Sequence, residues 1–187
     1  MIKASSLRNK DEINSISSLP GYYKWWAAKS EFALILKALK VQLEDIQQAI
    51  ETKDDLFCIY VGIAVKESVR ARLNWHVNDK HTVSQVNTGT LSTLRQSISS
   101  IVSGNQFDKA ATDSFIDKLY VEWFYSKNQV KSEEAMIELH EIEKNQMADF
   151  FCILNIQDNH HPFARTTKIE LKRLRKESKA CNKAKIS

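Results

Sequence analysis

Residues 22–27 (YYKWWA) and 56–61 (LFCIYV) are the two stretches that decide the fold. Each is short and rich in aromatic or β-branched residues, which predicts a strand, and Gly62 ends the second one. Between them, residues 30–52 contain regularly spaced apolar residues and no Pro or Gly, which predicts one long helix with Lys40 as the candidate break. The two strands are therefore separated by a helical insertion.

The rest of the chain continues this mixture of helices and one more strand. Apolar spacing predicts helices over 66–77, 90–103, 132–150 and 167–179, a third strand over 119–125 (LYVEWFY) and a polar loop over 78–89. The expected fold class is α/β (α+β): a small, three-stranded, mostly antiparallel sheet flanked by helices, with the helical insertion between the first two strands.

The composition is that of a globular protein of 187 residues, with 43% hydrophobic and 27% charged residues. No run approaches about 18 consecutive apolar residues, so we expect no membrane span, and residues 1–10 lack the apolar core of a signal peptide. The three cysteines are widely spaced and odd in number, which favours reduced thiols and a cytoplasmic location over a disulfide scaffold.

Positive charge is concentrated at the C-terminus. Residues 165–187 hold nine Lys or Arg and two Glu, a formal charge of +7, whereas the whole chain carries +4. A basic end on a mildly acidic body favours a polyanionic partner, most simply nucleic acid, although basic termini are also common on solvated helices. We therefore divide the chain into a body, 1–160, with its insertion at about 28–55, and a basic C-terminal helix or tail, 161–187.

Polar side chains recur at the ends of the predicted strands and on the helices that follow. The first strand begins Gly-Tyr-Tyr at 21–23, and the second ends Tyr-Val-Gly at 60–62. Arg72 and His76 are four residues apart, so they share one helix face, and a later helix carries Glu134, Glu138 and Glu141 on another. Leu-Asn at 154–155 follows that helix.

In this order, these pieces resemble the GIY-YIG nuclease family over roughly residues 19–159. The two triplets match the family's two signature triplets, with Tyr22 in place of Ile, and residues 72–76 (RLNWH) match its Arg-Leu helix. Residues 89–95 (GTLSTLR) resemble a stretch found in bacterial members. The triplets are farther apart than usual, since Tyr23 and Tyr60 are separated by 37 residues.

The resemblance implies a catalytic role for six residues, namely Tyr23, Tyr60, Arg72, His76, Glu138 and Asn155. Tyr23 would help to deprotonate the attacking water, with a nearby cation lowering its pKa, and Tyr60 would position phosphate or water. Arg72 would hold the scissile phosphate with its planar fork, and His76 would hydrogen-bond Tyr23 or relay its proton. Glu138 would bind one Mg²⁺, and Asn155 would supply an amide near that metal.

Without the resemblance, each of these residues also has an ordinary structural explanation. A tyrosine at a strand end is usually a packed aromatic, and a row of acids on a helix is usually a solvated face. Glu138 is the acid chosen here, and Glu134, which lies one turn earlier on the same helix, is the alternative metal ligand.

The sequence therefore predicts an Mg²⁺-dependent DNA endonuclease that acts by a single-metal mechanism. In the basic tail, Lys172, Arg173, Arg175 and Lys176 would follow the phosphates of DNA, without reading its sequence. The main alternative is a catalytically inactive nucleic-acid-binding protein with the same fold; an unrelated enzyme or a protein-interaction domain is less favoured. The oligomeric state stays open, although cutting of both strands would favour a homodimer.

Overall fold

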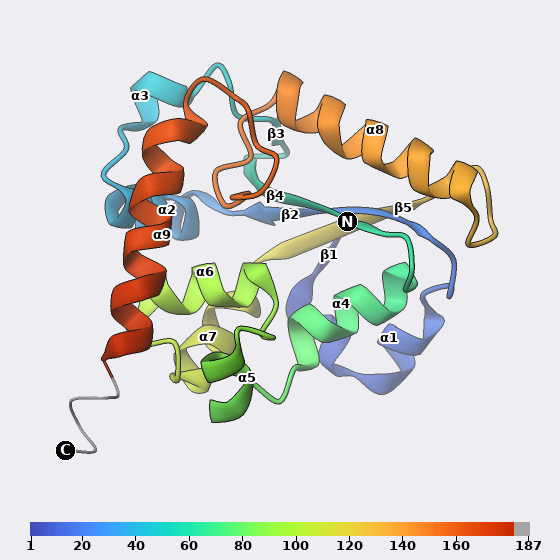
Figure 1. The fold of residues 1–187 in the computed structure, drawn as a ribbon, viewed down its shortest axis with the longest axis horizontal. Coiled ribbons are helices and arrows are strands. Elements are labelled where there is room, and N and C mark those ends of the chain that lie inside the picture. Colours follow the sequence, from blue (N-terminus) through green and yellow to red (C-terminus); the bar gives the residue numbers. More distant parts are fainter. Residues whose placement is uncertain (182–187) are drawn as a thin grey trace.

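The structure is a computed structural model that describes residues 1–181. One antiparallel sheet lies at its centre, with helices on both faces (Figure 1). The strands are β1 (Ile2–Lys3), β2 (Gly21–Ala27), β3 (Thr52–Lys53), β4 (Leu56–Ala64) and β5 (Tyr120–Tyr125). The α-helices are α1 (Lys10–Ser15), α2 (Lys29–Leu39), α3 (Leu43–Ile46), α4 (Val69–Asn78), α5 (Val83–Thr88), α6 (Thr93–Val102), α7 (Lys109–Ile116), α8 (Glu133–Asp149) and α9 (Ala164–Ala180), and a 3₁₀ helix covers Ala4–Arg8.

The sheet has five strands in the order β1-β5-β2-β4-β3, and every pair is antiparallel. The three predicted strands are confirmed as its central members, β5, β2 and β4. The prediction of three strands in total was wrong, because β1 and β3 add one short strand at each edge. Each of these has only two residues, which is too short to leave an alternating pattern in the sequence.

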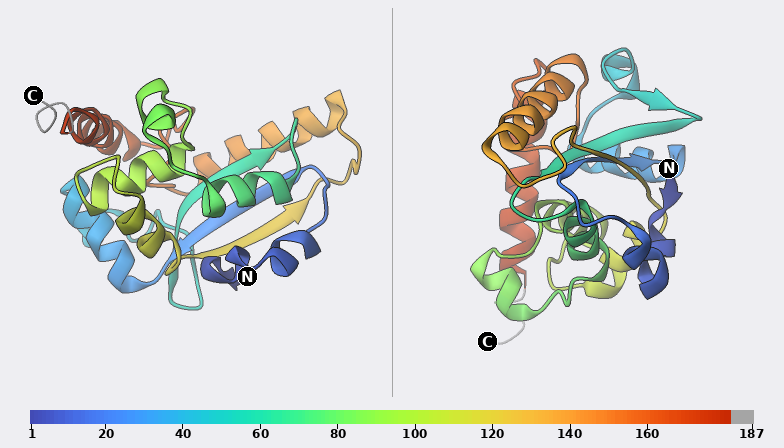
Figure 2. Two further views of the ribbon diagram at one scale, coloured as in Figure 1. Left: turned by 90° about the horizontal axis from the view of Figure 1, so that it is seen from below. Right: turned by 90° about the vertical axis from the view of Figure 1, so that its right-hand side faces the viewer.

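Both faces of the sheet are covered, and this explains the nearly continuous apolar character of β2. Side chains alternate between faces along a strand. Trp25 packs with Leu73 of α4 in the main core, whereas Trp26 packs with Met147 of α8 in a second cluster, and both tryptophans are fully buried. Figure 1 accordingly shows α8 on one side of the sheet and α4, α6 and α7 on the other, and the same layers are visible in the turned views of Figure 2.

The insertion between β2 and β4 contains α2, α3 and β3. The predicted single helix over 30–52 is wrong in length, since α2 ends at Leu39, but the candidate break at Lys40 is confirmed. Lys40 has a left-handed backbone (φ 57°), and its N–H donates to the Lys37 carbonyl (3.3 Å), which is a common way to end a helix. Phe32 of α2 stacks on Phe57 of β4, with ring centroids 4.4 Å apart, and so holds the insertion against the sheet.

The segment 78–89 is not a simple loop, because α5 lies within it. Its start is fixed by a capping box, in which Thr82 and Gln85 each satisfy the other's backbone N–H. The prediction of a loop was wrong for residues 83–88, because a helix of six mostly polar residues is too short to leave an apolar periodicity in the sequence.

The C-terminal helix α9 packs against α6. Leu171 is buried in the main core, and the Ser178 and Ser100 hydroxyls are 2.8 Å apart. The last six residues of the predicted basic tail, 182–187, lie outside the described residues. Within residues 1–181, none of the helices has the length and apolar character needed to cross a membrane.

Candidate active site

Tyr23 and Gly62 face each other across the central strands. They are Cα partners in the β2–β4 ladder, and a Cβ atom built on Gly62 would lie 2.6 Å from the Tyr23 hydroxyl oxygen. The phenol ring therefore lies directly over the Gly62 backbone, with only 2% of Tyr23 exposed. The second triplet ends in glycine because its partner, the tyrosine of the first triplet, occupies the space of a side chain.

We expect Gly62→Ala to displace the Tyr23 ring, because the added methyl group would overlap it and the buried site offers no free volume. Such overpacking costs about 1–3 kcal/mol of unfolding free energy, which urea denaturation measures. An alanine variant as stable as the parent chain would mean that the ring does not depend on this contact.

His76 lies against Tyr23 from the neighbouring helix α4. Its Nε2 atom is 2.9 Å from the Tyr23 hydroxyl oxygen, and the Tyr60 ring is 6.1 Å away, measured between centroids. Helix α4, which carries His76, begins at Val69 because the side chain of Ser68 caps it by accepting a hydrogen bond from the Ala71 N–H (3.1 Å). Three predicted site residues are thus brought together on one face of the sheet.

Burial keeps these three side chains uncharged. It raises the pKa of Tyr23 well above its usual value of 10, and it raises the pKa of Tyr60 to about 12. Burial, together with the charges of Arg72 and Arg95, lowers the pKa of His76 to about 3. The expected lowering of the Tyr23 pKa by a nearby cation is therefore outweighed, because desolvation of the phenolate is the larger effect.

Arg72 supplies the positive charge of the site. It lies one turn before His76, its guanidinium carbon is 5.0 Å from the centroid of the Trp75 ring, and its Nε is 3.2 Å from a carboxylate oxygen of Glu67. One third of its side chain is exposed. Its charge lowers the pKa of both tyrosines, so the guanidinium is close enough to act on both phenols while still reachable from solvent.

Asn155 covers the free edge of β4. Its Nδ2 donates to the Val61 carbonyl (2.8 Å) and its Oδ1 accepts from the Val61 N–H (3.0 Å). The Leu154 N–H also donates to the Ile59 carbonyl (2.9 Å). The amide therefore completes the ladder as another strand would, directly beside Tyr60, and it connects the segment after α8 to the site.

Glu138 and Glu134 lie near the start of α8. The Glu138 carboxylate accepts from the Ser126 hydroxyl (2.6 Å), the Lys127 N–H (3.1 Å) and the Asn128 amide (3.3 Å), and the first two of these bonds are the main cause of its lowered pKa. The Glu138 carboxylate therefore holds the loop between β5 and α8 in place through these three hydrogen bonds. Glu134 is exposed in the first turn of the helix.

A different acid of α8, Glu143, is the one that acts on the tyrosines. Its charge raises the pKa of Tyr23 and of Tyr60. The pKa of Glu143 itself is raised to about 7 by burial and by the charge of Asp158, against the opposing effect of Arg72. Glu143 and Asp158 line one pocket of about 290 Å³, together with His140, Lys144, Met147 and His160.

Sequence reasoning missed Glu143, although the sequence contains a signal for it. The buried residues of α8 are Ala135, Leu139 and Met147. Glu143 fills the remaining position of this row with a spacing of four, so it is an acid on the face that packs against the sheet. Glu141, which was grouped with Glu134 and Glu138, is exposed on another face.

The four basic residues of α9 that were predicted to bind DNA fall into three groups. Arg173 is held by Glu170 (2.7 Å) and by Glu177, so its charge is balanced. Lys172 and Lys176 are exposed. Arg175 is partly buried, donates to Gln96, and lowers the pKa of Tyr60, which means that this helix reaches the candidate site.

Of the three comparisons with known proteins, one finds a match. The family model for the GIY-YIG catalytic domain matches residues 21–177, which include β2, β4, α4, α8 and nearly all of α9. No curated protein and no solved structure matches the chain.

Proposed function

Because this chain belongs to the GIY-YIG nuclease family, we propose that it is an Mg²⁺-dependent DNA endonuclease that hydrolyses phosphodiester bonds with one metal ion. The observation that carries the proposal is the convergence of two neutral phenols, one guanidinium and one partly buried carboxylate from four separate elements. Hydrolysis of a phosphodiester needs these functions together: charge neutralisation at phosphorus, an oriented water and a stabilised leaving group.

Arg72 would bind the scissile phosphate. A guanidinium offers a planar fork of N–H donors that fits two phosphate oxygens. Trp75 and Glu67 hold this fork in place, and the exposed third of the side chain gives a strand of DNA access to it.

Tyr23 and Tyr60 would orient the attacking water and the phosphate oxygens. Both are neutral at physiological pH, so each offers an O–H donor and oxygen lone pairs rather than a negative charge that would repel phosphate. The hydrogen bond between His76 Nε2 and the Tyr23 hydroxyl fixes the position of that hydroxyl.

Glu143 is the carboxylate that we propose as the metal ligand, in place of Glu138. Among residues 1–181, no group of three or more His, Cys, Asp or Glu side chains is positioned to hold a metal ion. Mg²⁺ does not need such a group, since it binds through one or two carboxylates, several waters and substrate phosphate. The donor set fits, because a carboxylate whose pKa is raised by burial and by Asp158 is relieved by a cation beside it.

A magnesium ion bound at Glu143 would stabilise the negative charge that develops on the 3′-oxygen leaving group. The Glu138 carboxylate, by contrast, already accepts three hydrogen bonds that a metal would have to displace.

DNA would run from the site along α9. The pocket that contains Glu143 shares His160 with a second pocket, of about 330 Å³, lined on α9 by Arg165, Lys168 and Lys172. These residues and Arg175 are spaced by three or four, so they form one basic stripe.

We expect the double variant Arg165→Ala/Lys172→Ala, which removes two exposed members of this stripe, to weaken DNA binding and to make it less sensitive to salt, since each lost phosphate contact reduces the slope of log K against log salt by about 0.9. Arg173→Ala should leave binding nearly unchanged, because Glu170 and Glu177 already neutralise that guanidinium. Fluorescence anisotropy of labelled duplex DNA between low and moderate salt measures both. An equal loss in the two variants would exclude the proposed stripe.

Supercoiled plasmid distinguishes the nuclease from the inactive DNA-binding alternative. A nuclease with Mg²⁺ converts the plasmid to nicked or linear forms, and excess chelator stops the conversion. A binding protein only retards the plasmid in a gel. Retardation without cleavage across a range of divalent metals and pH values would favour the alternative.

A further inference from the structure

The Ser92 hydroxyl lies directly behind His76, on the side away from Tyr23. Ser92 belongs to the stretch 89–95 (GTLSTLR), to which the proposed function gives no role. Its Oγ is 3.0 Å from Nδ1 of His76, and neither residue has access to solvent, since Ser92 is 0% exposed and His76 is 2% exposed. The side chains of Ser92, His76 and Tyr23 therefore form one buried chain of hydrogen bonds.

The hydrogen bonds of Ser92 determine which atom donates and which accepts in each bond between Ser92, His76 and Tyr23. A serine hydroxyl has one hydrogen to donate and two lone pairs. As the N-cap of α6, the Ser92 oxygen accepts the Arg95 N–H (3.3 Å), which uses one lone pair. Among the described residues, the only other partner of this oxygen is Nδ1 of His76. A buried hydroxyl hydrogen needs an acceptor, so Nδ1 is that acceptor and carries no hydrogen.

The remaining hydrogen of the imidazole then lies on Nε2. The groups that face the ring are Tyr23, Trp25, Tyr60, Arg72 and Trp75, with Ser92 and Arg95 behind it. The charged members, Arg72 and Arg95, are both cations, and with burial they keep the imidazole neutral. A neutral imidazole has one N–H, and the acceptor for it is the Tyr23 hydroxyl oxygen.

We infer that Ser92 is a positioning residue: it holds His76 in the Nε2–H tautomer, so that His76 donates a hydrogen bond to Tyr23 and does not take its proton. The bearing of this inference on catalysis rests on the proposed function. The two hydroxyls beside the imidazole differ in this respect: Ser92 is 0% exposed and has no other acceptor among the described residues, whereas Tyr23 lies at the proposed site, where water or phosphate accepts its phenolic hydrogen. An N–H donor on the phenol oxygen also stabilises negative charge there as it develops.

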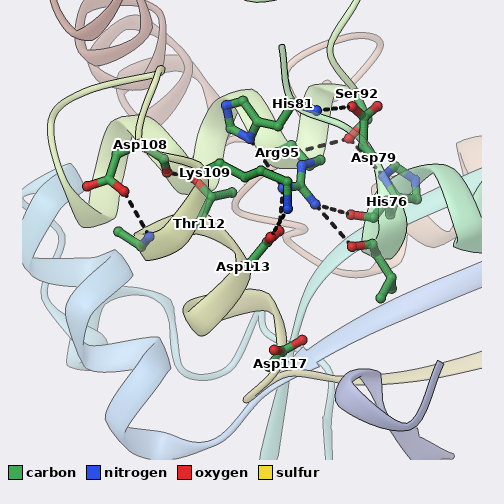
Figure 3. Close-up of polar contacts among 12 residues, drawn as sticks. His76, Asp79, His81, Ser92, Arg95, Asp108, Lys109, Thr112, Asp113 and Asp117 are labelled. Carbon is green, nitrogen blue, oxygen red and sulfur yellow. Dashed lines mark hydrogen bonds and ion pairs between the residues drawn. The ribbon is translucent and has the colours of Figure 1, made fainter. Parts of the chain in front are cut away.

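Arg95 keeps the Ser92 hydroxyl at this distance. It is fully buried, and its Nη1 donates to the backbone carbonyls of His76 (2.8 Å) and Val77 (3.3 Å) at the end of α4. Its Nη2 forms an ion pair with Asp113 of α7 (2.5 Å). Figure 3 shows this guanidinium between the end of α4 and α7. The start of α6, including Ser92, is thereby fixed to the helix that carries His76.

The tautomer can be measured directly, without DNA and without activity. In protein labelled with ¹⁵N-histidine, the shifts of the two ring nitrogens distinguish a protonated from a bare nitrogen, and His76→Asn identifies the His76 signals by their loss. We expect a protonated Nε2 and a bare Nδ1 at pH 7. The opposite tautomer in the parent chain would overturn the inference even if the protein cleaves DNA as proposed.

Ser92→Ala tests the consequence of this hydrogen bond. Without the serine hydroxyl, we expect the ring-nitrogen shifts of His76 to move towards a mixture of tautomers, and kcat to fall on the order of 10- to 100-fold with little change in KM. Ser92→Thr keeps the hydroxyl and should restore both values. Thr82→Ala removes a hydroxyl N-cap from α5, which carries no site residue, and should change neither.

Unchanged His76 shifts in Ser92→Ala would also contradict the inference. If that variant does not fold, the tautomer of the parent chain still decides. If the parent chain has the expected tautomer but cleaves no DNA under any condition, the proposed function fails while the assignment of Ser92 stands.

Discussion

Arg72→Ala is expected to reduce DNA cleavage by at least about 10³-fold, because among residues 1–181 Arg72 is the one basic residue whose charge acts on both Tyr23 and Tyr60. The side chain is one third exposed and its Nε pairs with a glutamate that is itself exposed, so the variant should fold. Single-turnover cleavage of a labelled duplex measures the loss, and circular dichroism checks the fold. Arg72→Lys should recover only part of the activity, since an ammonium keeps the charge but loses the fork.

The matched control for this variant is Arg70→Ala. Arg70 is on the same helix, two residues earlier, and donates instead to the Asn14 carbonyl and to Ser18. It has the same charge and a similar position on α4 but faces away from the site. Equal losses in the two variants would show that general attraction of DNA, and not a specific phosphate contact, explains the role of Arg72.

Glu143→Gln is expected to abolish Mg²⁺-dependent cleavage, with a loss of about 10² to 10³-fold or more, whereas Glu138→Gln should retain it. An amide has nearly the same shape as the carboxylate but cannot offer the negative charge that Mg²⁺ requires. The two variants differ only in which acid of α8 is neutralised, so each is the control for the other. Cleavage lost in Glu138→Gln and kept in Glu143→Gln would restore the assignment made from the sequence.

The same pair of variants should have opposite effects on stability. The folded-state pKa of Glu143 is raised to about 7, so the folded chain binds this proton more tightly than the unfolded chain, and stability falls as pH rises from 4.5 through 7. Glu143→Gln removes this cost and should stabilise the protein at pH 8, by on the order of 1–3 kcal/mol. The pKa of Glu138 is lowered, so its contribution is present above pH 4.5, and Glu138→Gln should destabilise the protein there.

Thermal or urea unfolding at pH 5 and pH 8 measures both effects. Magnesium binding should follow the same titration, becoming tighter as pH rises through 7, because the metal competes with the proton on Glu143. Calorimetric titration with MgCl₂ at several pH values checks this. Binding that is independent of pH between 6 and 8 would argue against Glu143 as the ligand.

Much of the site could be predicted from the sequence because its determinants are local. The two tyrosines are at positions fixed by short aromatic strands, and Arg72 and His76 share a face because they are four residues apart on one helix. The break at Lys40 and the cap at Ser132 are also local features. For these residues, backbone periodicity alone specifies which side chains are neighbours.

The choice among the acids of α8 depended only in part on local spacing. Glu134 and Glu138 share one face of this helix, whereas Glu143 belongs to the row of Ala135, Leu139 and Met147, so periodicity separates the two faces without saying what each one contacts. Which direction faces the tyrosines depends on how α8 is rotated on the sheet, and that rotation is set by the burial of Ala135, Leu139 and Met147 against β4 and its neighbours.

The sequence by itself thus determined the central strands, the family and the residues whose neighbours are close in the chain. Only the tertiary structure decided that Glu143 is the acid of α8 whose charge raises the pKa of both phenols, that Arg173 is neutralised and that Ser92 lies behind His76. The physical reason is that these contacts join residues from separate elements, and their geometry follows from the packing of whole helices, which no spacing along one helix records.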